Sequence, residues 1–397
     1  MIVIFFKKVI TLVVSFKLKI RKSKNISYAR HKINKSDIRA VSKALKSDWL
    51  TIGPLVEELE SKIKNKTNSE AVVVSSGTAA LHCAYYAIGC TEGDEIITPA
   101  ITFAATQATA KIFGATIKYA DIDYDSGNIN IESAANLINK KTKAIVTVDY
   151  AGQPTNLNKL KELAVKNNIY LIEDAAHSFG SSYEGKPVGS IADLTTFSFF
   201  ATKNITTGEG GAITSNNREL LEKARKFARQ GLERDKNNLQ IVTEGLWHQE
   251  VQSQGLNYRL PDILCALGIS QLKNIDKFKE IRRKIFRTYY ESLSSIAQLD
   301  LPFSDPNTDP FWHLFAVKVP SEKRLEFFNY MRKNGVLVQV NYLPVYRHPF
   351  FEDSSSEANC PNAEYFYSRE VSLPIHANLT TSQLKKILNL IHKFKFD

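Results

Sequence analysis

Lys203 is the first residue whose type and position could support covalent chemistry. It comes shortly after an apolar run, FSFF, and precedes a turn rich in Thr and Gly, NITTGEGG. In α/β folds ligands bind at the carboxyl ends of strands, where burial lowers the pKa of a lysine and leaves a nucleophilic amine for Schiff-base formation. A single lysine in such a place is more often a solvated loop residue, so the interpretation depends on neighbouring features.

Asp174 is the second candidate, because an apolar strand, IYLIE, ends directly before it, and His177 follows three residues later. A buried carboxylate is unfavourable unless a cation accompanies it. The protonated nitrogen of a pyridine ring is such a cation, and a ring held in that state withdraws electrons from the groups attached to it. The alternative for a lone acid at the end of a strand is a helix N-cap.

Two further features stand between a predicted strand and a predicted helix. The run 75–79, SSGTA, contains Gly77 and Thr78. Free N–H groups at a helix start bind anions, so a phosphate would fit there, although an ordinary Ser/Thr capping turn is an equal alternative. Phe103 occupies a similar place in PAITFAATQAT. It could stack on a flat ring, but a core phenylalanine is the commoner case.

Taken together, these four features match the needs of pyridoxal phosphate: an amine for its aldehyde, a carboxylate for its ring nitrogen, a cradle for its phosphate and an aromatic surface for its ring. The chain has no GxGxxG, since Gly208, Gly210 and Gly211 have the wrong spacing, which argues against dinucleotide binding. It also has no HExxH and no clustered His/Asp ligands, so we expect no metal.

The elements that must position these residues alternate between strands and helices. Short runs rich in β-branched residues predict seven strands, at 71–75, 95–98, 116–120, 144–149, 170–173, 194–199 and 211–215. Helical patterns separate the early ones, at 79–88, 104–113, 131–139 and 157–167. This alternation predicts an α/β domain with a mostly parallel sheet and helices on both faces.

The pattern changes after about residue 217. Helices are predicted at 218–229, 263–272 and 278–293, and the segment 302–310, PFSDPNTDP, predicts a surface loop or linker. Strands near 313–319 and 336–340, with helices near 323–334 and 381–394, indicate a small α+β unit. We therefore expect an N-terminal extension at 1–25, a large α/β domain at 26–275 and a small C-terminal domain at 276–397.

Charge and cysteine content limit the classes of function. The 397 residues carry a formal net charge of +11, but ten basic residues lie within 1–36, before the first acid, Asp37. The rest of the chain is therefore close to neutral, which argues against a nucleic-acid partner. Four cysteines without paired spacing indicate a reducing compartment, the cytoplasm.

The extension 1–25 is both basic and apolar, and its apolar runs are shorter than the roughly 20 residues that span a bilayer. Three interpretations stay open: a weak interfacial membrane anchor, a disordered extension, or an upstream start codon that is not used.

The sequence resembles a known family through the runs SSGTAAL, TPAITFAATQA, DYAGQP, EDAAHSFG, FSFFATKNITTGEGGA, LNYRLPDILCALGISQL and VNYLPVY. It is similar over residues 26–394 to the DegT/DnrJ/EryC1/StrS sugar aminotransferases. The resemblance implies fold type I of the pyridoxal-phosphate-dependent transferases, which is aspartate aminotransferase-like, with a mixed seven-stranded sheet and a smaller α+β C-terminal domain. The stretches ITTGEGGA, TVDYAG, QVNYLPVY and SLPIHANL resemble one subfamily, the UDP-4-amino-4,6-dideoxy-N-acetyl-β-L-altrosamine transaminases of pseudaminic acid synthesis.

The resemblance also implies roles for individual residues. The catalytic residues would be Lys203 as the Schiff-base lysine, Asp174 at the ring nitrogen and His177 near the ring's phenolic oxygen. The other cofactor contacts would be Gly77, Thr78 and Ser198 at the phosphate, Phe103 on the ring, and Asn257 from a second subunit, which implies a homodimer with shared active sites. The sugar nucleotide would meet Tyr28, Asp48, Trp49, Leu50, Thr51, Val340, Asn341, Tyr342 and Leu343.

The implied reaction moves the amino group of L-glutamate to the 4-keto carbon of a UDP-linked sugar. Two departures from the family pattern bear on the choice of sugar: Phe200 stands where relatives usually have His, and YARHKI near Tyr28 replaces a segment that often carries Gly and Gln. A transaminase of perosamine or bacillosamine type therefore remains an alternative, as does a non-catalytic sugar-nucleotide-binding relative. Relatives that act as dehydratases have His in place of the lysine, which Lys203 argues against. Arg259 is a further candidate for gripping glutamate.

Overall fold

The structure is a computed structural model that describes residues 25–241, 245–351 and 358–396. The predicted extension 1–25, apart from Asn25, lies outside the described residues, and so do the three interpretations of it. Within the described parts of the chain, no helix is long and apolar enough to cross a membrane. The four cysteines are all buried free thiols, as their spacing predicted.

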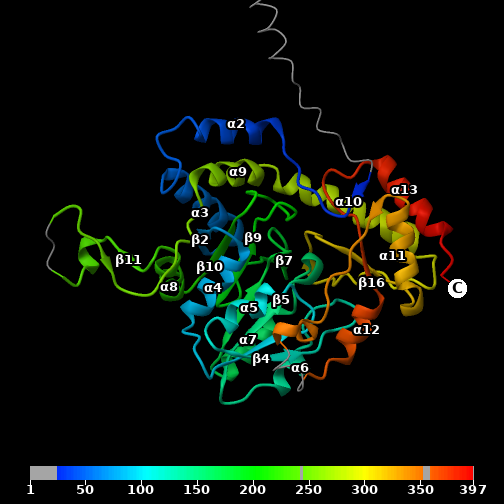
Figure 1. Cartoon of the computed structure of the whole chain (residues 1–397), viewed down its shortest axis with the longest axis horizontal. Helices are drawn as coiled ribbons and strands as arrows, with labels where there is room; N and C mark the ends of the chain where they lie inside the picture. The colour runs from blue at the N-terminus through cyan, green and yellow to red at the C-terminus, as the bar shows by residue number, and fades with distance from the viewer. Residues whose placement is uncertain (1–24, 242–244, 352–357, 397) are drawn as a thin grey trace, which may run out of the picture.

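Seven strands form the central mixed sheet (Figure 1). In spatial order from one edge to the other they are β2 (Glu70–Val74), β10 (Gly211–Ser215), β9 (Leu194–Ser198), β6 (Tyr170–Asp174), β5 (Thr142–Val148), β3 (Glu95–Pro99) and β4 (Thr116–Ala120). Neighbouring strands are parallel, except that β10 runs antiparallel to both β2 and β9. Each predicted strand overlaps one of these seven, and the predicted mixed sheet is confirmed.

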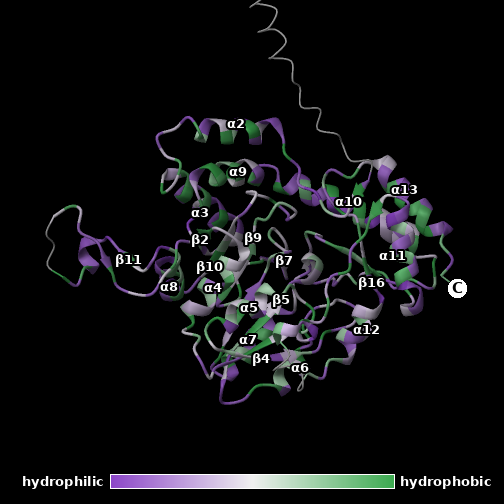
Figure 2. Ribbon diagram, in the orientation of Figure 1, coloured by the Kyte–Doolittle hydropathy of each residue, from purple (hydrophilic) through white to green (hydrophobic). Residues whose placement is uncertain are grey.

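Helices cover both faces of this sheet because alternate strand residues point to opposite sides. In β2, Val72 and Val74 belong to one apolar cluster, whereas Ala71 and Val73 belong to another. The first face is covered by α4 (Gly77–Ala87), α5 (Ala105–Lys111) and α8 (Arg218–Ala228). The second is covered by α3 (Pro54–Thr67), α6 (Ile131–Asn136), α7 (Leu157–Lys166) and α9 (Asp262–Leu272). Figure 2 shows the hydrophobic character of the central strands against the more hydrophilic loops.

A smaller α+β part surrounds a separate apolar cluster. Its elements are β14 (Phe315–Lys318), β16 (Glu370–Leu373), α10 (Ile275–Leu293), α11 (Arg324–Lys333) and α13 (Thr381–Lys393). The buried residues of α12 (Pro361–Arg369) belong instead to the apolar cluster on the first face of the sheet. The short strand β1 (Ile26–Ser27) pairs in parallel with β15 (Val336–Leu337), so the start of the described chain lies against this smaller part. The predicted domain boundaries at 25/26 and 275/276 stay predictions.

Peripheral elements complete the chain. An arm built on β11 (Leu232–Glu233) and β12 (Glu250–Val251) projects from the body, at the left of Figure 1. The helix α2 (Lys35–Ala44) lies along α9, where the Gln271 amide donates to an oxygen of Asp37 at 2.8 Å. The remaining short elements are β7 (Ser182–Tyr183), β8 (Lys186–Pro187), β13 (Thr308–Asp309) and the 3-10 turns η1 (Tyr150–Gly152), η2 (Lys236–Asn238), η3 (Ser321–Lys323) and η4 (Val345–Arg347).

Candidate active site

A cavity of about 540 Å³ opens at the carboxyl ends of the parallel strands, where β6 and β9 deliver their last residues; we call it the Lys203 cavity. Its walls come from the start of α4, the turn before α5, the loop after β9 and the segment before η4. The predicted site residues that line it are Tyr28, Gly77, Thr78, Phe103, Asp174, His177, Ser198, Lys203, Asn341 and Tyr342. Residues far apart in the sequence thus meet in one space.

Lys203 lies in the turn after β9, where its backbone N–H donates to the carbonyl of Phe200 at 3.0 Å. Burial lowers the pKa of Lys203 to about 8, with the charge of Asp174 opposing the shift and that of Arg282 adding to it. About a tenth of the Lys203 side chains are therefore uncharged amines at pH 7. An uncharged amine is the form that attacks a carbonyl.

Asp174 is buried at the end of β6, with 6% of its surface exposed. Its Oδ2 accepts a hydrogen bond from Thr106 Oγ1 at 2.8 Å, and its Oδ1 accepts one from the N–H of Ala176 at 3.2 Å. Burial raises the pKa of Asp174, while the two hydrogen bonds and Lys203 oppose that shift. The site thus holds a carboxylate that a cationic ring nitrogen would stabilise in its charged form.

His177 is buried among other aromatic side chains. Its Nε2 and the hydroxyl of Tyr342 are 3.2 Å apart, and its ring stacks on His313 with centroids 4.3 Å apart. Burial, with the nearby charges of Lys203 and Arg282, holds the pKa of His177 well below its usual range. The imidazole is therefore neutral, and its Nδ1 has no hydrogen-bond partner among the described residues.

The start of α4 has the geometry of an anion site. Ser76 is the N-cap, and its Oγ accepts from the N–H of Ala79 at 3.0 Å. The N–H groups of the first helical turn have no partner within a helix, so those of Gly77 and Thr78 remain available to a ligand. A Cβ at Gly77 would lie 2.8 Å from the Cβ of Ser198, so glycine permits the close approach of α4 to β9.

Two aromatic side chains line the cavity and are substantially exposed. Phe103 is 62% exposed and Phe200 is 43% exposed. The ring of Phe103 lies 6.1 Å from that of Tyr342. The exposure of Phe103 rules out the alternative of a core phenylalanine and leaves its face free for a flat ligand.

The other predicted contacts do not line the Lys203 cavity: Asp48, Trp49, Leu50, Thr51, Asn257, Val340 and Leu343. The segment 48–51 is exposed between α2 and α3, and Asn257 is exposed at the base of the arm. Val340 and Leu343 are half-buried beside the cavity-lining pair of Asn341 and Tyr342. The predicted contact of Asn257 through a second subunit and the predicted sugar contacts of 48–51, Val340 and Leu343 stay predictions.

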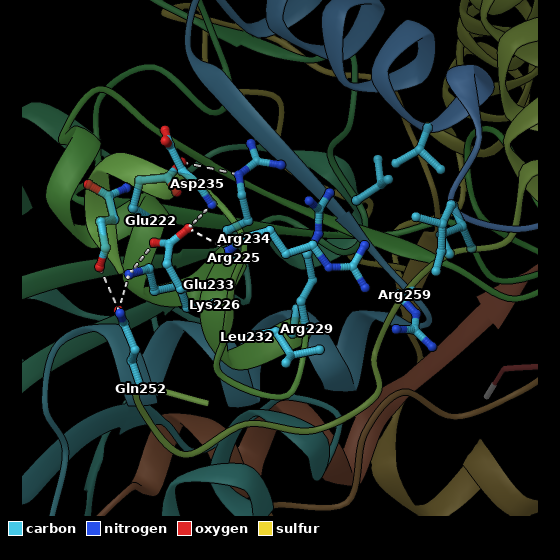
Figure 3. A pocket seen from close by; sticks show the side chains of 16 residues that line it. Glu222, Arg225, Lys226, Arg229, Leu232, Glu233, Arg234, Asp235, Gln252 and Arg259 are labelled. Carbon is cyan, nitrogen blue, oxygen red and sulfur yellow. Dashed lines mark hydrogen bonds and ion pairs between the residues drawn. The ribbon is translucent and has the colours of Figure 1, made fainter. Parts of the chain in front are cut away.

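Arg259 lies in a different cavity, of about 630 Å³, beside the end of α8 (Figure 3); we call it the α8 cavity. Four of its eight charged lining residues are in ion pairs: Arg225 pairs with Glu60 at 2.9 Å and with Glu222 at 3.1 Å, and Lys226 pairs with Glu233 at 2.9 Å. Arg259 itself donates to the side-chain oxygen of Gln230 at 3.0 Å. Nothing in the described subunit places Arg259 at the Lys203 cavity.

Sequence reasoning missed two residues of the site. Thr106 holds Asp174 from α5, and His313 lines the cavity and stacks on His177. A hydroxyl in the first turn of the helix that follows Phe103 was a weak signal for Thr106. No local signal marked His313, because its position depends on a contact with a residue more than a hundred positions away.

The comparison with protein families decides the class of the protein. The model of the DegT/DnrJ/EryC1/StrS aminotransferase family matches residues 31–392. The chain belongs to this family. It is 38% identical, over 91% of its length and 95% of the relative's, to the UDP-4-amino-4,6-dideoxy-N-acetyl-β-L-altrosamine transaminase of Campylobacter jejuni. It is 33% identical, over 90% and 95%, to the GDP-perosamine synthase of Escherichia coli O157:H7.

Solved structures agree with this assignment. The aminotransferase PseC of Helicobacter pylori, involved in the biosynthesis of pseudoaminic acid, superposes with a TM-score of 0.86 at 32% identity, covering 93% of this chain and 99% of that one. A sugar aminotransferase of Streptococcus pneumoniae in its pyridoxal phosphate form gives 0.86 at 27% identity, covering 92% and 97%. This aminotransferase therefore has fold type I and uses pyridoxal phosphate.

The residues of the Lys203 cavity fit that cofactor. The amine of Lys203 suits its aldehyde, the start of α4 suits its phosphate, and the carboxylate of Asp174 suits its ring nitrogen. The unpartnered Nδ1 of His177 leaves one buried polar atom for a ligand oxygen.

Proposed function

We propose that this aminotransferase transfers the amino group of L-glutamate to C4 of a UDP-linked 4-keto-6-deoxy-N-acetylamino sugar. The product would be UDP-4-amino-4,6-dideoxy-N-acetyl-β-L-altrosamine, a precursor of pseudaminic acid. The observation that carries the proposal is the meeting of Lys203 and Asp174 in one buried cavity. The similarity to the Campylobacter transaminase and to the Helicobacter structure supports the choice of sugar.

We assign the chemistry to three side chains. Pyridoxal phosphate supplies an electron sink for the transfer. The Nζ of Lys203 takes the proton from the α-carbon of glutamate and returns a proton to C4 of the sugar in the second half-reaction. Its pKa of about 8 leaves the amine able to do both near neutral pH. Asp174 keeps the cofactor nitrogen protonated, and His177 hydrogen-bonds the ring's phenolic oxygen.

The walls of the Lys203 cavity also supply the residues that we propose bind the cofactor and the sugar. Gly77, Thr78 and Ser198 would hold the phosphate, and Phe103 would cover the ring face. Tyr28 and Tyr342 would border the sugar from the other side of the cavity.

We also propose a homodimer in which Asn257 reaches the phosphate of the partner's site. The projecting arm supports this, because its large apolar side chains lie in solvent in the single chain: Leu246 is 86% exposed and Trp247 is 75% exposed. Exposed apolar patches of this kind mark protein interfaces. The four buried thiols further support a reducing compartment, the cytoplasm.

A different keto sugar is the second candidate. The similarity to GDP-perosamine synthase is of the same order as that to the altrosamine transaminases. Phe200, exposed in the cavity, removes a polar group that relatives usually supply there. A bacillosamine-type substrate belongs to the same class. The cavity that brings Lys203 and Asp174 together argues against a protein that only binds sugar nucleotides.

The test is a substrate panel. Purified protein is given L-glutamate and UDP-, dTDP- and GDP-linked 4-keto-6-deoxy sugars, and release of 2-oxoglutarate is followed. We expect the highest kcat/KM with the UDP-linked N-acetylamino keto sugar that leads to the altrosamine. A higher value with the GDP-linked sugar would replace the proposed substrate by a perosamine precursor. If no 2-oxoglutarate is released with any of these sugars, the proposed function is overturned.

A further inference from the structure

Glu370, the first residue of β16, is a buried acid outside the Lys203 cavity that the chemistry above does not use. None of its surface is exposed, and burial raises its pKa to about 8. It forms no salt bridge with the described residues. A buried carboxylate is unfavourable unless its oxygens are satisfied. Here Oε2 accepts from the N–H of Asn341 at 2.7 Å, and Oε1 accepts from the hydroxyl of Ser372.

Asn341 forms hydrogen bonds to buried groups through its N–H, its carbonyl and its side chain. Its carbonyl accepts from the hydroxyl of Tyr150 at 2.6 Å, and its Nδ2 donates to Ser372 Oγ at 3.0 Å. Its side chain is also hydrogen-bonded to Tyr28. The N–H, the carbonyl and Nδ2 of Asn341 therefore each have a partner within the protein.

The next residue, Tyr342, links the restrained backbone of Asn341 to the Lys203 cavity. Its hydroxyl lies 3.2 Å from Nε2 of His177, and its ring faces Phe103 across the cavity. Nε2 and Nδ1 belong to one ring, so the bond to Tyr342 fixes the direction in which the free Nδ1 of His177 points. The orientation of Tyr342 depends in turn on the clamped backbone of Asn341.

We propose that Glu370 is a positioning residue for the active site: by clamping the backbone of Asn341 it sets the place of Tyr342, and through Tyr342 the orientation of His177. Asn341 then acts by holding its neighbour in place. The proposal rests on the proposed function only in taking the Lys203 cavity as the place of reaction.

The test compares two substitutions at Glu370 with the same two at Glu95. Glu370→Leu removes both acceptor oxygens, whereas Glu370→Gln keeps an acceptor of the same reach for the N–H of Asn341. Glu95 is the matched control, because it is also buried and accepts from Asn139 at 2.6 Å, but lies at the opposite, amino end of β3.

Amide hydrogen exchange and turnover are measured for all four variants. We expect Glu370→Leu to speed exchange in the peptide 338–345 about tenfold, the equivalent of one lost hydrogen bond, and to lower kcat/KM for the keto sugar at least as much. Glu370→Gln should stay within about threefold of the unmodified protein in both measurements, on the same grounds. Both Glu95 variants should leave exchange at 338–345 unchanged.

Two results would overturn the proposal: unchanged exchange at 338–345 in Glu370→Leu, or equal losses in the Gln and Leu variants at Glu370. If Glu370→Leu fails to fold, Glu370→Ala, which also removes both acceptor oxygens, takes its place in the comparison with Glu370→Gln. The exchange result does not depend on any sugar. If exchange changes as expected but no keto sugar is turned over, the proposed function is rejected and the positioning role of Glu370 still holds.

Discussion

The α8 cavity and the Lys203 cavity differ in how their charges are compensated. The α8 cavity is larger and richer in charged side chains, yet ion pairs neutralise half of them, as in the pairs of Arg225 with Glu60 and Lys226 with Glu233. In the Lys203 cavity no salt bridge joins Lys203 to a described carboxylate, and burial shifts the pKa values of Lys203 and His177 strongly downward.

This difference shows that neither volume nor number of charges identifies the reactive site. A paired charge on a partly exposed surface stays in its ordinary protonation state, whereas an unpaired group that burial removes from water is shifted away from it. Groups displaced in this way are able to exchange protons near neutral pH, which is what catalysis requires. The predictions below compare the two cavities residue by residue.

The largest difference in turnover is expected between variants of two lysines, Lys203 and Lys226. Lys203→Ala removes the amine that carries the cofactor and moves the proton, so turnover should fall at least about a thousandfold. Lys226→Ala breaks an ion pair in the α8 cavity and should change turnover less than about twofold. Steady-state kinetics with saturating pyridoxal phosphate compares them. Similar losses in both variants would remove the distinction between the cavities.

The next largest difference, in kcat, is expected between variants of Asp174 and Asp235. Asp174→Asn leaves the shape of the site but removes the charge that keeps the cofactor nitrogen protonated, and we expect kcat to fall by roughly a hundredfold, as for loss of other electrostatic groups at reacting centres. Asp235→Asn, in the wall of the α8 cavity, should leave kcat unchanged. An Asp174→Asn enzyme with undiminished kcat would show that another group protonates the ring.

A smaller effect concerns pH. Because the pKa of Lys203 is lowered to about 8, its amine is mostly protonated below that pH and mostly free above it. The rate at which cofactor-free protein binds pyridoxal phosphate should therefore rise about tenfold from pH 6 to pH 7 and level off above pH 8. Stopped-flow absorbance measures it. A rate that still rose tenfold between pH 9 and pH 10 would mean an ordinary, solvated lysine.

The smallest effect on activity is expected at Arg225. Replacing Arg225 by Met breaks its ion pairs with Glu60 and Glu222 and should lower the free energy of unfolding by about 2 kcal/mol. The value of kcat should change less than about twofold, since the α8 cavity takes no part in the chemistry within one subunit. Urea unfolding and kinetics test both halves. A large fall in kcat with unchanged stability would bring the α8 cavity into the reaction.

Much of the sheet was predictable because each central strand is a short β-branched run that is buried on both faces. The strand β1 was not, since two residues carry no periodicity, and its pairing with β15, which lies within the strand predicted near 336–340, depends on distant parts of the chain. Helices α2, α3 and α12 were also missed. The segment 302–310, predicted as a loop, contains β13, which forms only because Thr308 meets Tyr183 of β7.

The residues of the active site show the same distinction between local sequence pattern and tertiary contact. Lys203 and Asp174 could be predicted because each follows an apolar strand that ends where ligands bind. Glu370 and His313 could not, because their roles arise from contacts with Asn341 and His177, which only the folded chain provides. Local pattern reveals the residues that face the ligand, and tertiary structure is needed to see what holds them there.

Reductive trapping tests the central claim most directly. The protein is purified with pyridoxal phosphate, treated with borohydride to fix the carbon–nitrogen bond to the cofactor, and digested for mass spectrometry. We predict a yellow protein that is bleached by borohydride and carries the pyridoxyl phosphate group on Lys203 alone. A protein that takes up no cofactor, or one that carries the group on a lysine of the α8 cavity such as Lys226, would contradict the account.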